Sequence, residues 1–197
     1  MHPLPDDRPI VVAIAGPNGA GKSTFYHAFL RDCGLRFVNA DEIARELELD
    51  PYAAANVADA LREELVRQRE SFIFETVFSD PAGDKLAFLQ RADAAGYCVV
   101  LCFVGISSPE VAETRVAMRV SQGGHDVPTD KLTARFPRTS MNLKNAIRQL
   151  PLVLVFDNDD LARPYRRVAE FERGQQKSLF KPIPVWLKSS IQGLMRE

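Results

Sequence analysis

The chain has 197 residues, of which 46% are hydrophobic and 26% are charged, and its formal net charge is −1. This length suits one α/β domain with a substantial core, and the composition argues against a disordered or fibrous protein. The near-neutral balance gives no general attraction to nucleic acid or anionic lipid, so neither is expected as a partner. We therefore expect a single domain over residues 1–197.

The sequence shows no export signal and no membrane span. Residues 1–7 do not resemble a signal peptide, and no apolar run approaches the ~20 residues that a membrane-spanning helix needs. Cys33, Cys98 and Cys102 form neither a C-x-x-C pair nor a metal-ligand pattern. These features predict a cytoplasmic protein in which Cys98 and Cys102 act as small buried hydrophobic residues.

Residues 10–30 carry the strongest motif of the chain. An apolar run over residues 10–15 predicts a strand buried on both faces, and residues 25–30 have apolar spacing compatible with a helix. The stretch between them fits the G-x-x-x-x-G-K-S pattern of the phosphate-binding P-loop. The loop residues are Gly16, Pro17, Asn18, Gly19, Ala20, Gly21, Lys22, Ser23 and Thr24.

The residue types of this loop suit ATP and Mg²⁺. Glycines let successive backbone amides converge on phosphate oxygens, and a helix that begins near Lys22 adds the positive end of its dipole. Lys22 is predicted to contact the β- and γ-phosphates and Ser23 to bind Mg²⁺, with Thr24 as a weaker candidate for phosphate contacts. The alternative is a glycine-rich turn that matches the motif by accident, and the correct flanks argue against it.

A second and a third strand follow the P-loop helix. Residues 35–38 suit a short strand, and Asn39 with Glu42 forms a variant capping box that predicts a helix start. Residues 53–70 have the spacing of an amphipathic helix. Residues 72–78 suit a buried strand that contains Glu75 and Thr76. Because an unpaired buried carboxylate is costly, Glu75 either works in a site or has a buried partner.

The rest of the chain continues to alternate helices and strands. We expect helices at 83–95, at 107–121 and at 129–150, strands at 99–104 and 152–156, one or two weak strands at 166–181 with a turn at Gly174, and a closing helix at 183–195. The third of these helices should be capped by Thr129 and broken or bent near Pro137. This alternation predicts an α/β fold, a three-layer sandwich with a mostly parallel central sheet.

In such a sheet, ligands bind at the carboxyl ends of the strands. Gly16, Asp41, Glu75 and Asp157 all fall at or just beyond strand ends. Asp157 resembles a Walker-B acid, but its strand comes late in the chain, so we interpret Asp157 and Asn158 as a turn near the nucleotide base.

Two arginines precede a glycine-bearing loop and two follow it, which gives residues 115–138 the composition of a lid. Such a lid would neutralise charge on a transferring phosphoryl group and exclude water. The alternative is a pair of solvated basic helices, and His125 is interpreted as a residue that fixes the loop. The arginines are Arg115, Arg119, Arg135 and Arg138.

The C-terminal extension, residues 161–197, is basic. It holds eight Lys or Arg and three Glu. A solvated face is the ordinary explanation, and a surface for an RNA end is the alternative, which steep salt dependence of binding would support.

The ordered set of motifs from residue 10 to about residue 160 resembles the zeta-toxin-like family of P-loop kinases. The resemblance implies a nucleotide-kinase-like fold, Asp41 as catalytic base, Glu75 and Thr76 as substrate contacts, and Arg119 and Arg135 as phosphate-binding lid residues. It also implies phosphorylation of a sugar hydroxyl of UDP-N-acetylglucosamine and a small antitoxin as partner. The last 35 or so residues match no motif of that family.

We therefore predict an ATP-dependent, Mg²⁺-requiring kinase for a small-molecule hydroxyl, with Asp41, Lys22, Arg119 and Arg135 as catalytic residues. A carboxylate must reach the attacking hydroxyl, although Asp41 also fits as a first-turn acid favoured by the helix dipole. Alternative acceptors are a nucleoside, another sugar or an RNA end. A different class of function is an ATP-dependent switch whose ordered lid is recognised by a partner protein.

Overall fold

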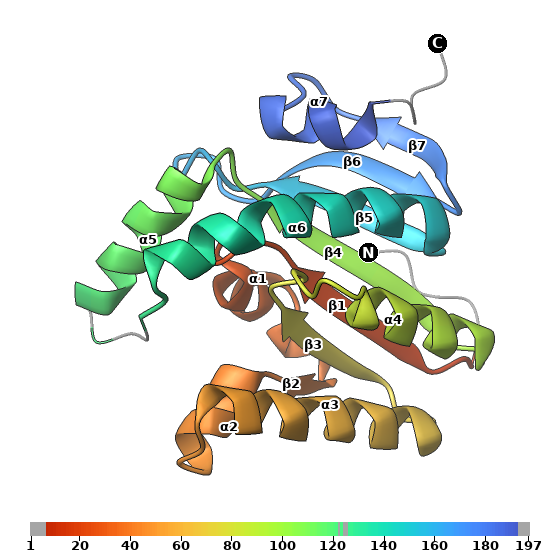
Figure 1. The fold of residues 1–197 in the computed structure, drawn as a ribbon. Coiled ribbons are helices and arrows are strands. Elements are labelled where there is room, and N and C mark those ends of the chain that lie inside the picture. The colour runs from red at the N-terminus through yellow and green to blue at the C-terminus, as the bar shows by residue number, and fades with distance from the viewer. Residues whose placement is uncertain (1–6, 122, 124–125, 193–197) are drawn as a thin grey trace.

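The computed structural model of this protein describes residues 7–121, 123 and 126–192, and seven strands within them form one sheet (Figure 1). The strand order is β2-β3-β1-β4-β5-β6-β7, and all neighbours from β2 to β5 are parallel. The strands are β1 (Ile10–Ala15), β2 (Arg36–Val38), β3 (Phe72–Thr76), β4 (Cys98–Gly105), β5 (Leu152–Asp157), β6 (Arg166–Glu172) and β7 (Gln175–Leu179). The predicted mostly parallel sheet is confirmed, and β6 and β7 are its antiparallel edge.

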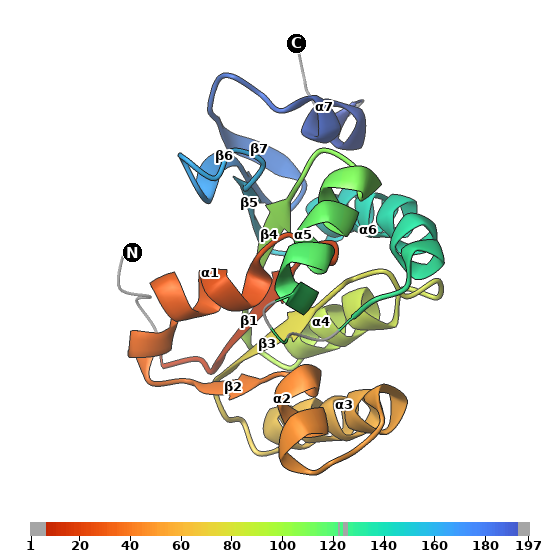
Figure 2. The ribbon, with the colours of Figure 1, turned by 90° about the vertical axis from the view of Figure 1, so that its left-hand side faces the viewer.

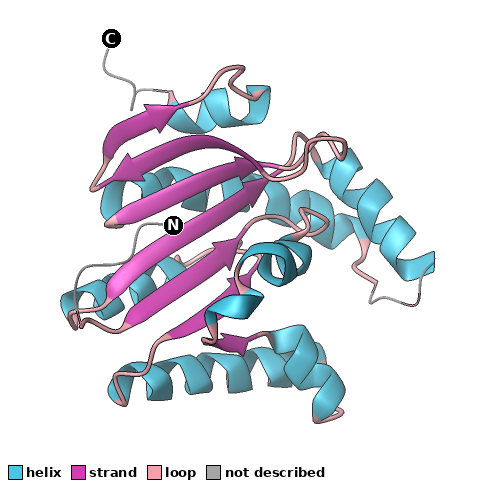
Figure 3. Cartoon of the chain, turned by 180° about the vertical axis from the view of Figure 1, so that it is seen from behind, coloured by secondary structure: helices cyan, strands magenta, loops and turns pink. Residues whose placement is uncertain are grey.

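Helices cover both faces of the sheet, with α1 on one face and α4 and α6 on the other (Figure 2). Figure 3 shows the sheet from behind as one continuous layer. The helices are α1 (Lys22–Phe29), α2 (Ala40–Glu46), α3 (Pro51–Arg67), α4 (Asp84–Ala94), α5 (Pro109–Ser121), α6 (Thr129–Gln149) and α7 (Val185–Ile191), with a 3-10 turn η1 (Arg31–Cys33). The predicted three-layer α/β sandwich is therefore confirmed. In the described part of the chain, no helix combines the length and apolar character needed to cross a bilayer.

Each face of the sheet has its own apolar cluster. Val11 and Ala13 of β1 pack in the cluster that also takes buried residues from α4, α6 and α7, whereas Ile14 packs on the opposite side with Phe25 of α1. The central strands are therefore buried on both faces, as parallel strands usually are. This packing holds the central strands in place, and so fixes the positions at which the loops after them begin.

Helix α6 departs from its prediction at two points. It is not broken at Pro137, although that residue has no N–H to donate to the preceding turn, and a bend at that residue stays a prediction. Buried Leu143 and Ile147 anchor the helix to the core, and such tertiary packing overrides local propensity. The predicted Thr129 cap is also wrong, because Pro128 occupies the N-cap and the Thr129 hydroxyl donates to Glu113 instead, at 2.7 Å.

Two further predictions reach the limits of what is described. The closing helix is α7, and residues 193–195 of the predicted span lie outside the described residues. His125, predicted to fix the lid loop, also lies outside them.

Candidate active site

The parallel strands end at one edge of the sheet, and a cleft of about 970 Å³ opens there. Gly16, Pro17 and Ala20 are buried in the P-loop and do not line the cleft. All the other predicted site residues line it: Asn18, Gly19, Gly21, Lys22, Ser23, Thr24, Asp41, Glu75, Thr76, Arg119 and Arg135. The fold thus brings residues from five separate segments of the chain to one cavity.

The P-loop needs glycine near its two ends because neighbouring segments leave no room for a side chain. At Gly16, φ is 146° and a Cβ would lie 2.1 Å from the carbonyl oxygen of Val104 in β4. At Gly21, φ is 88° and a Cβ would lie 2.8 Å from the Tyr165 hydroxyl and 2.9 Å from Asn158 Nδ2. Both glycines therefore permit close approach as well as an unusual backbone conformation.

Lys22 is the first residue of α1 and is only 6% exposed. Its ammonium donates to the carbonyl oxygen of Pro17 at 3.1 Å and lies 3.7 Å from Glu75 Oε1. Burial lowers the pKa of Lys22, and the negative charges of Glu75 and Asp41 oppose that effect. Arg119 adds to the lowering. The ammonium is therefore poorly solvated and suited to an anionic ligand.

Glu75 joins the P-loop to the start of α2. Its Oε2 accepts hydrogen bonds from the Ser23 hydroxyl at 2.8 Å and from Asn39 Nδ2 at 3.2 Å. Glu75 therefore has partners, and those partners themselves line the cleft. The Ser23 hydroxyl and the Glu75 carboxylate place two oxygen groups together, which is the ligand chemistry that Mg²⁺ prefers. Among the described residues, no group of three or more His, Cys, Asp or Glu is placed to hold a metal ion.

Asn39 is a functional candidate that the sequence analysis treated only as a cap. Its Oδ1 accepts from the backbone N–H of Asp41 at 2.8 Å and of Glu42 at 3.4 Å, so the predicted cap of α2 is confirmed. Its Nδ2 donates to Glu75, a residue 36 positions away. One asparagine thus orients the turn that carries Asp41 and the carboxylate beside Lys22, and Asp41 itself is exposed on the cleft wall.

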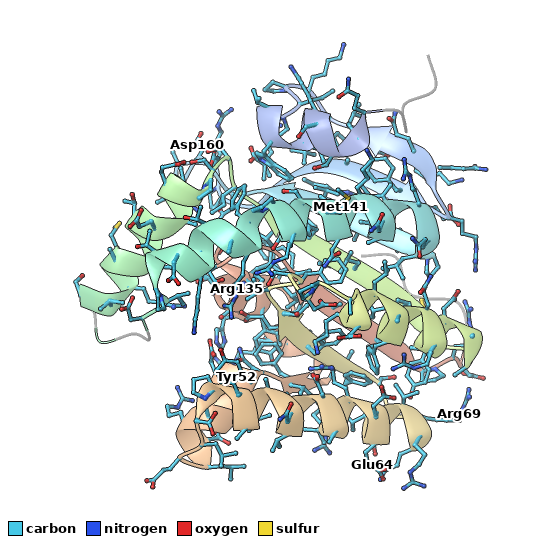
Figure 4. All side chains as sticks on the ribbon, viewed as in Figure 1. Tyr52, Glu64, Arg69, Arg135, Met141 and Asp160 are labelled. Carbon is cyan, nitrogen blue, oxygen red and sulfur yellow. The ribbon has the colours of Figure 1, made fainter. Side chains whose placement is uncertain are left out.

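The four predicted lid arginines all line the cleft, Arg115 and Arg119 from α5 and Arg135 and Arg138 from α6. Arg115 donates to the carbonyl oxygen of Asp159 at 2.9 Å. Figure 4 shows Arg135 extending from α6 toward the middle of the molecule, with Tyr52 on the start of α3 below it. The arginines therefore share the cavity of Lys22, while movement of these helices as a lid stays a prediction.

Beyond Glu75 the cleft is lined by residues of α3, of the segment after β3, of α4 and of α6. We call this part the acceptor arm, after the role proposed for it below, and its polar lining residues are Asp59, Arg62, Asp80, Lys85 and Arg138. Lys85 Nζ lies 2.8 and 2.7 Å from the two carboxylate oxygens of Asp59, which also accepts a hydrogen bond from Arg62. Asp80 Oδ1 and Arg138 Nε are buried there without a hydrogen-bond partner. The sequence analysis missed this arm, because its charges resemble those of ordinary solvated helices.

The segment that follows β3 lines the acceptor arm and is fixed by α6. Phe78 is 1% exposed with φ of 61°, which is rare for a bulky residue. Asn142 Nδ2 donates to the carbonyl oxygens of Phe78 and Asp80 at 3.0 and 3.1 Å. Thr139 Oγ1 donates to the carbonyl oxygen of Val77 at 3.2 Å. One face of α6 therefore presents Arg135 and Arg138 to the cleft and also fixes the wall of the acceptor arm.

A family model described as "Zeta toxin" matches residues 2–170, which is most of the chain. The chain belongs to the zeta toxin family. The match includes every predicted site residue, whereas β7 and α7 lie beyond it.

Other proteins are similar to this zeta toxin family member in fold or in sequence. A chain of the AvrRxo1-ORF1:AvrRxo1-ORF2 complex with ATP is 17% identical with a TM-score of 0.71, and the match covers 96% of this chain but 65% of that one. The PezAT chromosomal toxin-antitoxin system of Streptococcus pneumoniae gives 14% identity, a TM-score of 0.63, and coverage of 98% of this chain and 87% of the other. An uncharacterized protein of Haemophilus influenzae is 28% identical over 127 residues, 61% of this chain and 88% of its own length. The fold is that of the P-loop kinases.

In this zeta toxin family member, the Asp157 side chain bonds to the C-terminal extension and not to the P-loop. One carboxylate oxygen accepts from an Arg166 NH₂ group and the other from Trp186 Nε1, both at 3.0 Å. Asp157 does not line the cleft, whereas the next residue, Asn158, does. These contacts argue against Asp157 as a Walker-B metal ligand.

Proposed function

We propose that this protein is an ATP-dependent kinase that transfers the γ-phosphate of ATP to a hydroxyl group of a small molecule. One observation carries the proposal. The P-loop Lys22, the Ser23–Glu75 pair and the exposed Asp41 line one cleft, and that cleft continues into a polar acceptor arm. A nucleotide switch needs the first part of this arrangement but has no use for the second.

In this proposal the loop from Gly16 to Thr24 binds the phosphates through its backbone amides, and Lys22 neutralises the β- and γ-phosphates. Ser23 would bind Mg²⁺, with the adjacent Glu75 orienting the hydroxyl or the water around the ion. When bound, Mg²⁺ neutralises charge on the β- and γ-phosphate oxygens. Arg119 and Arg135 offset the charge that develops on the transferring group and help to exclude water.

Asp41 accepts the proton of the attacking hydroxyl, while Glu75 and Thr76 contact the acceptor. The acceptor arm supports a polar substrate, because a ligand there would supply a donor for Asp80 and an acceptor for Arg138. UDP-N-acetylglucosamine is the first acceptor to test, given the family. A small antitoxin is the partner that we propose, since one similar structure holds AvrRxo1-ORF1 with AvrRxo1-ORF2 and another comes from the PezAT toxin-antitoxin system.

The test is phosphotransfer by the purified protein with ATP and Mg²⁺, with product masses read for UDP-N-acetylglucosamine, other sugars, nucleosides and RNA 5′ and 3′ ends. The proposal predicts that one acceptor gains one phosphate. Asp41→Asn should remove turnover while ATP stays bound. Its matched control is Glu42→Gln, because Glu42 is also a first-turn acid of α2 but does not line the cleft.

Three outcomes would contradict the proposal. Full activity in Asp41→Asn would exclude Asp41 as the base, and equal losses in Asp41→Asn and Glu42→Gln would show that Asp41 acts only through the helix dipole. Tight ATP binding with no acceptor phosphorylated would favour the switch.

A further inference from the structure

Two side chains from the segment after β5 donate hydrogen bonds to carbonyl oxygens of the P-loop, and both residues also line the cleft. Asn158 Nδ2 donates to the carbonyl oxygen of Ala20 at 2.8 Å, and the Tyr165 hydroxyl donates to that of Gly21 at 3.0 Å. Asn158 is 3% exposed, and its Oδ1 accepts from the backbone N–H of Tyr165 at 3.2 Å. The two side chains therefore form one hydrogen-bonded unit against the loop.

Peptide geometry converts these contacts into control of the phosphate site. In a trans peptide, the carbonyl and the next N–H lie in one plane and point in opposite directions. Holding the carbonyls of Ala20 and Gly21 therefore fixes the directions of the N–H groups of Gly21 and Lys22. Those amides belong to the part of the motif that surrounds phosphates at a helix N-terminus.

We propose that Asn158 and Tyr165 are positioning residues, which fix the amides of Gly21 and Lys22 in the orientation that binds nucleotide phosphates. They act through the loop backbone. The inference rests on the proposed function in one respect only, namely that the loop binds the phosphates of ATP. It does not depend on which acceptor is used, or on whether phosphate is transferred at all.

The residue types at these positions fit the role. An asparagine amide donates through nitrogen and accepts through oxygen, and an ionised aspartate in its place has no donor for the Ala20 carbonyl. Tyr165 has φ of 54°, which is unusual for an aromatic residue, and its ring centroid lies 5.4 Å from that of Phe25 in α1. Such a conformation persists where the surroundings over-determine it. The hydroxyl is therefore presented to Gly21 by a fixed ring.

Residues further along the C-terminal extension contact the residues next to this unit. Asp157, which precedes Asn158, accepts from Arg166 of β6 and from Trp186 of α7. The Asn158 N–H donates to the carbonyl oxygen of Gly105 at 2.9 Å, and a Cβ on Gly105 would lie 2.2 Å from the Trp186 ring. The part of the chain that matches no family motif is thus linked by contacts to the nucleotide site.

The experiment compares two tyrosines that lose the same atom. Tyr165→Phe removes the hydroxyl that bonds to the loop carbonyl. Tyr97→Phe is the matched control, because Tyr97 is 1% exposed and its hydroxyl donates to the carbonyl oxygens of Leu65 and Glu70 at 3.1 and 3.0 Å, at the opposite edge of the sheet. Affinity is measured for AMP-PNP with Mg²⁺ and, by competition, for tripolyphosphate, which has neither base nor ribose.

Tyr165→Phe should weaken both ligands by the same factor, about threefold to tenfold, which corresponds to one hydrogen bond. Asn158→Asp should weaken both by more than about tenfold, because it removes a donor and adds negative charge near the phosphates. Tyr97→Phe should lower the melting temperature and leave both affinities unchanged. A residue that only stabilised the fold would lower the melting temperature without weakening both phosphate ligands, so this split separates a role at the loop from a purely structural one.

The inference is overturned if Tyr165→Phe binds both probes as tightly as the parent. It is also overturned if AMP-PNP binding falls while tripolyphosphate binding does not, since Tyr165 would then contact the base or ribose directly. A parent protein that binds neither probe would overturn both the inference and the kinase. Loss of affinity in the variants without any phosphorylated acceptor would leave the inference standing and remove the kinase.

Discussion

The two ends of the cleft differ in how completely their polar atoms are bonded. At the nucleotide end, Lys22, Ser23 and Glu75 bond to one another or to the P-loop backbone. Among the described residues, buried side-chain atoms without a partner are Asn18 Oδ1, Arg62 Nε, Asp80 Oδ1 and Arg138 Nε, and three of these four belong to the acceptor arm. If the P-loop binds phosphates as proposed, its polar groups are already held in place, whereas the acceptor arm leaves three buried polar atoms with bonds still to be made by a ligand or solvent.

The largest effect should come from removing a lysine charge at the nucleotide end. We expect Lys22→Met to weaken ATP binding by on the order of 100-fold or more and to abolish turnover. Its melting temperature should change little, because relief of the desolvation that lowers the pKa of Lys22 offsets the loss of its contacts with Pro17 and Glu75. Titration calorimetry and thermal melts measure the two quantities.

The same substitution in the acceptor arm is the control for Lys22→Met. Lys85→Met should keep ATP affinity within about twofold of the parent. It should lower the melting temperature, since Asp59 then keeps only one of its two cationic partners, Arg62. Equal losses of ATP affinity in the two variants would mean that the ends of the cleft are not separate.

The lid arginines provide the next largest effect. Arg135→Ala should lower kcat by about 100-fold and change ATP affinity little, because the charge it offsets develops during transfer. Arg138→Ala should instead raise the KM for the acceptor, since its Nε is buried in the acceptor arm without a partner. Steady-state kinetics with the acceptor found in the screen separate the two. A lower kcat in both variants with unchanged KM would place both arginines at the phosphate.

Sequence could predict the nucleotide end because its chemistry is contiguous. The loop from Gly16 to Thr24 carries its own glycines, lysine and hydroxyl, and alternating apolar runs gave the strands around it. The contacts of Asn39 with Glu75 and of Asn158 with Ala20 join residues 36 and 138 positions apart, and no local pattern encodes them. The break predicted as one option at Pro137 does not occur for the same reason, since buried Leu143 and Ile147 hold α6 to the core.

A smaller effect is expected where α6 fixes the wall of the acceptor arm. Asn142→Leu removes the donor to the carbonyls of Phe78 and Asp80 and should lower the free energy of unfolding by about 1–3 kcal/mol. It should also raise the KM for the acceptor severalfold while ATP affinity stays unchanged. The neighbouring Met141 is 58% exposed, so Met141→Leu should change none of these quantities. A loss of ATP affinity in Asn142→Leu would show that the two ends are coupled through α6.

The last prediction is that a buried thiol close to the P-loop, that of Cys102, does not react. Cys102 is 5% exposed in the apolar cluster of Ile14 and Phe25, and burial raises the pKa of its thiol to about 12, whereas Cys33 is exposed. At pH 8 an aromatic disulfide should modify Cys33 and leave Cys102 untouched with or without ATP, as read by peptide mass, because thiolate is the reactive form. Because burial disfavours the thiolate of Cys102, this thiol should not affect the pH dependence of the free energy of unfolding near pH 8, and it should lower that free energy as the pH rises from about 9 toward 12. Modification of Cys102 that ATP suppresses would mean that the nucleotide end opens and is closed by its ligand, and the contrast between a preorganised and an incomplete end would then fail.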